Sequence, residues 1–87
     1  MPERLPPPPF WRTVYFEFTM SARPDRRDID PDHVQEILRQ PYRREMQADG
    51  RSRLWGYVAD RRRWLRVIVE PDGETVHNAF WDRKFRP

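Results

Sequence analysis

The first patterned run of the chain is Trp11–Met20, where β-branched and aromatic residues alternate with polar ones. Four hydrophobic residues of this run share one side of a strand with a period of two: Val14, Phe16, Phe18 and Met20. Alternation of this kind is typical of a strand with one buried side, so a strand is predicted here. Its other side mixes aromatic, hydroxyl and charged residues, and we expect it to meet solvent or to line a groove.

A helix is predicted to begin at Asp30 and to continue to about Gln40. Aspartate at the N-cap accepts hydrogen bonds from unpaired amides, and Pro31 loses no hydrogen bond at the first helical position. Three apolar residues share one narrow face, at positions i, i+3 and i+4: Val34, Ile37 and Leu38. Pro41 prevents continuation of the helix. A short amphipathic helix of this kind needs a sheet against which its apolar face is buried.

The second half of the chain predicts four strands, near Tyr42–Ala48, Arg53–Ala59, Trp64–Glu70 and Thr75–Trp81. They are separated by turn signals at Asp49-Gly50, at Asp60-Arg61-Arg62-Arg63 and at Pro71-Asp72-Gly73. Connections this short join antiparallel neighbours, so the strands should form a meander. The predicted fold class is α+β, with an N-terminal strand, one main helix on one face of the sheet, and a four-stranded antiparallel meander whose opposite face is open.

Alternation along the last two strands assigns their side chains to the two faces of the sheet. On the first of them, three residues should face the core: Leu65, Val67 and Val69. On the second, the buried set should be Val76, Asn78 and Phe80, and the accessible set Thr75, His77, Ala79 and Trp81. We therefore expect the guanidinium of Arg66 and the imidazole of His77 to emerge together from the open face.

One domain is expected over residues 10–87, because a chain of 87 residues holds material for a single hydrophobic core. Five of the ten prolines lie within residues 1–9, and the run Pro6-Pro7-Pro8-Pro9 favours an extended polyproline II segment. We interpret residues 1–9 as a proline-rich tail.

The basic side chains are sixteen arginines and one lysine, Lys84. Arginine binds phosphate or carboxylate through a planar fork of donors and also stacks on aromatic rings and bases. Residues 1–41 hold six basic and seven acidic side chains, whereas residues 42–87 hold eleven and seven. A basic second half favours an anionic partner, either nucleic acid or an acidic protein, although arginine-rich codon usage also explains an excess of arginine.

The composition excludes several classes of protein. With no cysteine and two histidines, the chain has no disulfide, no thiolate zinc site and few metal ligands, so neither a metal nor a cofactor is expected. No stretch approaches the roughly 20 apolar residues that span a bilayer, and no apolar signal-peptide region is present. We therefore expect a soluble, cytoplasmic protein without membrane association. Phosphate-binding loops, zinc-protease motifs and serine-hydrolase elbows do not occur in the sequence.

The strongest candidates for catalysis are Arg66, His77 and Arg83. A histidine can transfer a proton near neutral pH, and arginines stabilise phosphate charge, so these groups are sufficient for RNA cleavage by 2′-hydroxyl attack without a metal. The candidate nucleic-acid contacts are Arg61, Arg62, Arg63, Trp64, Trp81 and Lys84, in which the tryptophans are suited to stacking an unpaired base. A polar strand face with a solvated charge cluster and a solvated hairpin tip are the alternative interpretations.

Several short strings between about Trp11 and Phe85 resemble one family. They are I-D-P-D-H-V-Q-E-I-L-R-Q-P after Arg27, then D-G-R, L-R-V-I-V, P-D-G and T-V-H-N-A-F-W-D-R. On these strings the chain resembles the small uncharacterised domains related to BrnT-type toxins, within the RelE/ParE-like superfamily. The resemblance implies a RelE-like fold, metal-independent RNA cleavage and an antitoxin that neutralises the protein, whereas some relatives inhibit gyrase.

The family's basic position on the central strands corresponds to Arg66, and its C-terminal strand signature to Thr75, His77 and Arg83. Close relatives commonly carry a histidine before the helix, where this chain reads F-T-M-S-A-R and has none. The first hypothesis is a toxin-like, metal-independent endoribonuclease of the type II toxin–antitoxin kind. The second is a non-catalytic module that binds an acidic protein or a nucleic acid, and the third is a gyrase inhibitor. The expected partners are an antitoxin, RNA or the ribosome, and a second copy of the chain paired through an open edge strand.

Overall fold

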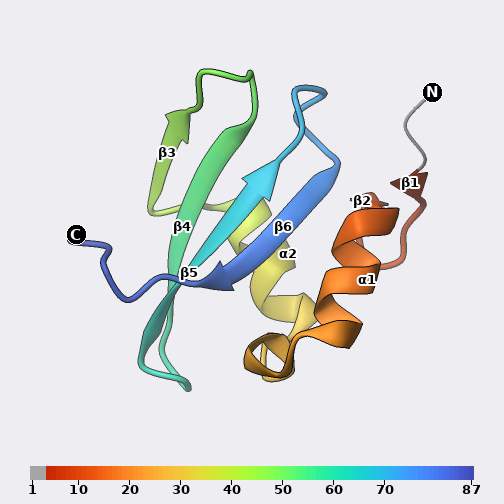
Figure 1. Ribbon diagram of the computed structural model, residues 1–87. Helices are drawn as coiled ribbons and strands as arrows, with labels where there is room; N and C mark the ends of the chain where they lie inside the picture. The colour runs from red at the N-terminus through yellow and green to blue at the C-terminus, as the bar shows by residue number, and fades with distance from the viewer. Residues whose placement is uncertain (1–3) are drawn as a thin grey trace.

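The computed structural model describes residues 4–87 and shows a mixed α+β fold, which confirms the predicted class (Figure 1). Its elements in chain order are β1 (Arg4–Leu5), β2 (Arg12–Thr13), α1 (Val14–Ala22), the 3-10 helix η1 (Pro24–Arg26), α2 (Pro31–Arg39), β3 (Arg43–Met46), β4 (Ser52–Val58), β5 (Arg63–Val69) and β6 (Val76–Trp81). The predicted layout with one helix is wrong, because the described residues form two α-helices and a six-stranded sheet.

The antiparallel meander of β3, β4, β5 and β6 is confirmed, and the strand order of the sheet is β1-β2-β6-β5-β4-β3. Gly50 and Gly73 lie in the predicted turns with φ of 90° and 79°, a conformation that glycine adopts without a steric clash. At the other side of β6, the short strand β2 pairs with it in parallel through Arg12 and Val76.

The prediction of a strand over Trp11–Met20 is wrong, because β2 ends at Thr13 and α1 follows it directly. Thr13 caps this helix, since its Oγ1 accepts a hydrogen bond from the Phe16 amide at 3.0 Å. Phe16 and Met20, one helical turn apart, pack into the core, whereas Phe18 is 70% exposed. Helical spacing therefore selects the buried residues, and tertiary packing overrides the β propensity of the run.

The second α-helix begins and ends where the sequence predicts. The Asp30 carboxylate accepts a hydrogen bond from the Asp32 amide at 2.8 Å, and α2 ends at Arg39, two residues before Pro41. Ile37 of this helix packs directly over Gly56 of β4, where an added Cβ atom would lie 2.5 Å from Cγ1 of Ile37. The close contact between α2 and the sheet therefore depends on glycine at position 56.

Both helices cover the same side of the sheet, with α2 behind β4 and β5 and α1 beside β6 (Figure 1). Leu65, Val67 and Val69 are buried on this side, as predicted. The faces of β6 differ from the prediction: Thr75 and Ala79 are buried, while Asn78 and Phe80 are only half-buried. The cause is a register shift, since Ile68 pairs with Asn78 and Val69 with Val76, which leaves His77 as an extra residue in β6.

Part of the expected proline-rich tail belongs to the sheet, since Arg4 and Leu5 form β1 antiparallel to β2; the prediction for residues 1–3 lies outside the described residues. The Arg4 guanidinium lies 3.8 Å from the ring centroid of Trp11 and donates hydrogen bonds to Asp72, Glu74 and Thr75. These contacts fasten β1 to the turn before β6. Over residues 4–87, no helix combines the length and the apolar character needed to cross a membrane.

Candidate functional site

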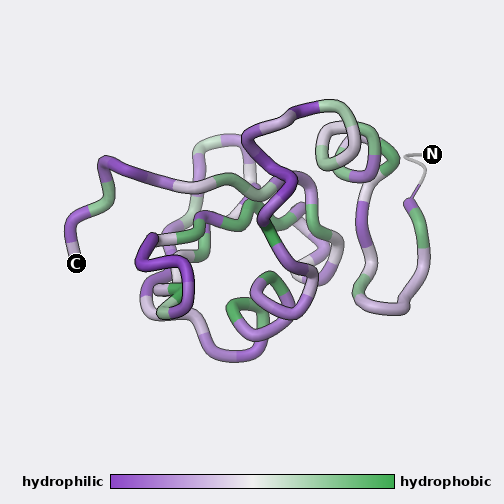
Figure 2. Tube along the Cα trace, turned by 90° about the horizontal axis from the view of Figure 1, so that it is seen from below, coloured by the Kyte–Doolittle hydropathy of each residue, from purple (hydrophilic) through white to green (hydrophobic). Residues whose placement is uncertain are grey.

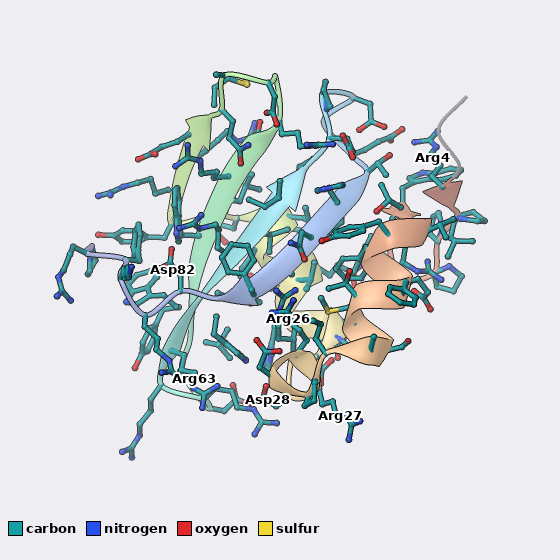
Figure 3. The ribbon with its side chains drawn as sticks, viewed as in Figure 1. Arg4, Arg26, Arg27, Asp28, Arg63 and Asp82 are labelled. Carbon is teal, nitrogen blue, oxygen red and sulfur yellow. The ribbon has the colours of Figure 1, made fainter. Side chains whose placement is uncertain are left out.

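A wide hollow of about 710 Å³ lies between η1 and the ends of β5 and β6. Five cationic side chains line it: Arg27, Arg63, Arg66, Arg83 and Lys84. Three carboxylates and two aromatic rings also line it, together with Pro24: Asp25, Asp28, Asp82, Phe80 and Trp81. Figure 3 shows Arg63, Asp28 and Arg27 in a row beneath the end of β6. We call this set of residues the cationic hollow.

Asp82 is the buried carboxylate of the cationic hollow, with 8% of its surface exposed. Its Oδ2 accepts hydrogen bonds from Trp55 Nε1 at 2.9 Å and from Arg66 Nη2 at 2.7 Å, and its Oδ1 accepts one from the Lys84 amide at 3.0 Å. Burial opposes ionisation of this carboxyl, but the hydrogen bonds from Trp55 and Arg66 outweigh burial and lower the pKa of Asp82 below 3.8. Its charge is therefore satisfied by internal donors.

Asp28 is held in the same way by residues of β5 and β6. Its Oδ1 accepts a hydrogen bond from Trp81 Nε1 at 2.8 Å, and its Oδ2 lies 3.4 Å from Arg63 Nη1. The Trp81 hydrogen bond is the main reason that the pKa of Asp28 lies below its ordinary value, with a smaller contribution from the charge of Arg63. The Arg63 guanidinium also lies 5.3 Å from the Trp81 ring centroid, so an aromatic face and a cation adjoin in this wall.

The remaining cations of the hollow are available to an external anion. Arg27, Arg83 and Lys84 are exposed, and none of them makes an ion pair with a carboxylate among residues 4–87. Arginine and lysine in this state bind phosphate or carboxylate groups of a partner. The site can therefore hold an anionic ligand beside an aromatic surface.

The sequence-predicted site residues divide between this hollow and other places. Arg63, Arg66, Trp81, Arg83 and Lys84 all line the cationic hollow, so the structure brings these five together. The three other predicted nucleic-acid contacts are outside it: Arg61, Arg62 and Trp64. Arg61 and Arg62 lie exposed at the turn between β4 and β5, and Trp64 packs on Phe85 with ring centroids 4.8 Å apart.

His77 is also outside the cationic hollow. Its Nδ1 lies 2.9 Å from Oε2 of Glu70, and its ring stacks on Tyr15 with centroids 5.0 Å apart. The other oxygen of Glu70, Oε1, accepts a hydrogen bond from Arg51 Nε at 3.0 Å. The imidazole is thus part of a polar chain that joins α1, β6 and the end of β5.

The structure does not join Arg66 and His77 in one centre. Glu70, which holds His77, follows Arg66 by four residues, which corresponds to about 13 Å along an extended strand. The Arg66 side chain instead reaches Asp82, at the opposite end of β6. Two arginines on this side of the sheet are already paired with two carboxylates each. Arg4 pairs with Asp72 and Glu74, and Arg51 pairs with Asp49 and Glu70. This neighbourhood does not favour a phosphate.

Sequence reasoning missed Arg27, Asp28 and Asp82 as parts of the site. Arg27 and Asp28 lie in a loop in which arginines and aspartates alternate in the sequence, and the fold places both of them against β5 and β6. Arg26 next to them is 9% exposed and donates hydrogen bonds to Asn78 Oδ1 at 2.9 Å and to the Ala79 carbonyl at 3.2 Å. These contacts bridge more than 50 residues, and no local pattern in the sequence indicates them.

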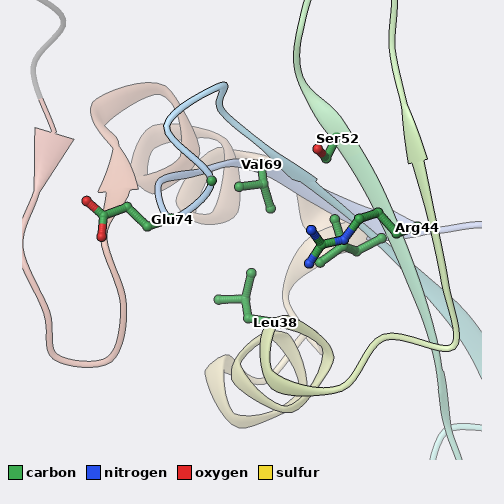
Figure 4. A pocket seen from close by; sticks show the side chains of 7 residues that line it. Leu38, Arg44, Ser52, Val69 and Glu74 are labelled. Atoms are coloured by element: carbon green, nitrogen blue, oxygen red, sulfur yellow. The ribbon is translucent and has the colours of Figure 1, made fainter.

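A smaller hollow of about 220 Å³ lies on the helix side of the sheet, with Leu38, Leu54 and Val69 in its lining. Figure 4 shows Arg44 and Glu74 on opposite sides of this hollow, with Leu38 between them. Its two charges balance, and Glu74 already binds Arg4 at 3.0 Å. This hollow therefore offers neither an excess of one charge nor a catalytic pair.

Fold and site together define an α+β protein with an arginine-rich hollow at one end of its sheet. Comparisons with family models, with curated proteins and with solved structures find no match to the chain. In the described part of the chain, residues 4–87, no three histidine or carboxylate side chains are grouped so that they can hold a metal ion.

Proposed function

We propose that the protein binds single-stranded nucleic acid in the cationic hollow without cleaving it. The observation that supports this proposal most is that Arg27, Arg83 and Lys84 face solvent around one hollow without a carboxylate partner among residues 4–87. Three such cations suit successive phosphates of a strand, and the adjacent Trp81 offers a ring to an unpaired base. A duplex would present no free base to this ring.

The test is a binding titration with a short fluorescent single-stranded RNA. The triple variant Arg27→Ala/Arg83→Ala/Lys84→Ala should bind at least about tenfold more weakly, because each lost phosphate contact removes counterion release. A matched control removes three cations that do not line the hollow, in Arg39→Ala/Arg44→Ala/Arg53→Ala, with the same change in net charge. Equal weakening in the two variants would disprove a site at the hollow. If the chain binds an acidic peptide but not RNA, the ligand of the hollow is an acidic, antitoxin-like protein and not a nucleic acid.

Endoribonuclease activity of the RelE-like, BrnT-like kind is the second proposal. It is favoured by the presence of Arg66 and Arg83 in one hollow, where two guanidiniums suit the charge of a phosphorane. His77 would have to leave Glu70 and Tyr15 to act at this place. In a cell such an enzyme would act in the cytoplasm on RNA or on ribosome-bound mRNA and would be neutralised by an antitoxin.

Cleavage is tested with bare RNA and with ribosomes carrying mRNA. We expect the intact chain to bind without producing fragments. Fragments that disappear in both Arg66→Ala and His77→Ala would establish the nuclease in place of the binding module. If none of the three proteins produces fragments, or if all three produce the same amount, the endoribonuclease proposal is rejected. DNA damage signalling on expression, rather than arrested translation, would support gyrase inhibition.

A further inference from the structure

An aromatic cluster lies on the face of the sheet opposite the core residues Leu54 and Leu65. Phe85 stacks on Trp55 with ring centroids 4.9 Å apart and an interplanar angle of 20°, and its ring also contacts Trp64 and Tyr42. The Arg43 guanidinium lies 5.0 Å from the Phe85 ring centroid. We call Tyr42, Trp55 and Trp64 the aromatic slot, in which Phe85 is 9% exposed.

The segment that carries Phe85 is attached to the sheet at Asp82, whose carboxylate accepts hydrogen bonds from Trp55 and Arg66. The Asp82 amide donates to the Trp64 carbonyl at 2.9 Å, and the Lys84 amide donates to Asp82 Oδ1 at 3.0 Å. From residue 85 to residue 87, the backbone makes no hydrogen bond with the part of the chain that the structure describes. Figure 2 shows this segment as mainly hydrophilic. Release of the ring therefore breaks no backbone hydrogen bond of residues 85–87.

The aromatic slot and the cationic hollow are neighbours. A third hollow, of about 320 Å³, is lined by Trp64 and Phe85 together with Trp81, Asp82 and Arg83 of the cationic hollow. A single-stranded nucleic acid whose phosphates contact Arg83 would thus have its bases close to Trp64. Tyr57, which is 53% exposed, lies 5.3 Å from Trp64 and extends the aromatic surface along β4.

We propose that Phe85 occupies the aromatic slot in place of a nucleobase, and that an unpaired base of the bound strand displaces it. Phe85 stacks on the Trp55 indole, with the Trp64 indole inclined to it by 55° and the Arg43 guanidinium alongside. Proteins stack unpaired bases on aromatic rings and guanidinium groups of this kind. The inference rests on the proposed function, since it gives the bases of the same ligand a binding place. Phe85 then acts as an internal competitor for the slot. The measured binding constant equals the intrinsic one multiplied by the fraction of molecules in which the slot is open, so a mostly closed slot lowers it.

The test compares the affinity of the intact chain and of Phe85→Ala for a labelled single-stranded RNA. The variant should bind about tenfold more tightly, because its slot is open before binding. Phe85→Tyr keeps a ring in the slot and should bind like the intact chain. An abasic oligomer with the same number of phosphates should bind both proteins equally, and addition of Trp64→Ala to Phe85→Ala should abolish the gain.

A second measurement follows Phe85 in a chain labelled with fluorophenylalanine. The fluorine resonance that Phe85→Tyr removes should shift toward its solvent-exposed position when RNA is added. If the intact chain binds RNA but Phe85→Ala gains nothing, or gains equally on the abasic oligomer, or the resonance does not move, the inference is overturned and the proposed function stands. If neither protein binds RNA, the proposed function fails and the inference fails with it.

Discussion

Arg66 donates two hydrogen bonds to one carboxylate oxygen of Asp82, from Nε at 3.0 Å and from Nη2 at 2.7 Å. The same oxygen accepts the indole hydrogen of Trp55. A guanidinium that the sequence marks as a candidate for catalysis therefore fixes the residue after β6 to the middle of the sheet. Asp82 thus orients this guanidinium and partly neutralises its charge.

Replacement of Asp82 should destabilise the protein through these contacts. Asp82→Asn leaves Arg66 without its buried anion, and we expect the free energy of unfolding to fall by about 1–3 kcal/mol. Urea denaturation followed by tryptophan fluorescence measures the change. The control is Asp25→Asn in the same hollow, whose carboxylate is 64% exposed and whose loss should change stability by less than about 0.5 kcal/mol. Equal effects of the two variants would contradict the role given to Asp82.

The pH dependence of stability follows from the carboxyls whose pKa is lowered in the folded state. The pKa values of Asp28 and Asp82 lie below 3.8 in the folded protein, so the unfolded chain binds their protons first as the pH falls. Their contribution is therefore complete above pH 3.8 and is lost as the pH falls through the folded values. Thermal unfolding between neutral and strongly acidic pH should show this loss. Asp82→Asn should show a smaller loss than the intact chain over the same range.

Gly56→Ala tests the packing of α2 on β4. The added methyl group would overlap the Ile37 side chain, and we expect a loss of about 1–3 kcal/mol in the free energy of unfolding. Ile37→Ala removes the atoms that the methyl group meets. The double variant should therefore be less destabilised than the sum of the two single variants, and strict additivity would contradict the close contact.

The sequence predicts the second α-helix correctly and the run Trp11–Met20 wrongly. Asp30, Pro31 and Pro41 act locally, through a cap, a fixed φ and a missing amide, so the bounds of α2 follow from the sequence alone. The alternation over Trp11–Met20 is misleading because Phe16 and Met20 also share one face of a helix. The contact of Phe16 with Phe10, which favours the helix, forms only in the folded core.

The candidate site is less predictable because its contacts are distant in the chain. Arg66, Arg83 and Lys84 were identified from their residue types, and the antiparallel return of β6 brings them together. The separation of His77 from Arg66 follows from the register of β5 and β6, in which Arg66 pairs with Phe80 and His77 lies beyond Asn78, the partner of Ile68. Alternation along a single strand does not indicate this register. Asp28 belongs to the site through Trp81, which is 53 residues away.

Salt dependence gives a further measure of the cationic hollow. For a single strand, the logarithm of the binding constant falls with the logarithm of the salt concentration by about 0.7 for each phosphate contact. Loss of Arg27, Arg83 and Lys84 together should therefore reduce the steepness of this line by about 2. Titrations at several salt concentrations measure it, and an unchanged slope in the triple variant would show that these side chains do not contact phosphate.

The parallel pairing of β2 with β6, and the position of α1 beside β6, leave the sheet asymmetric at its margins. Along the described residues, β3 presents four exposed residues at one margin, whereas the other ends in the two residues of β1. Fibres that grow by strand addition need two margins able to recruit a neighbour. A pair of molecules joined through β3 would therefore carry β1, a strand of two residues, at each free margin, where a further strand finds few backbone groups to pair with.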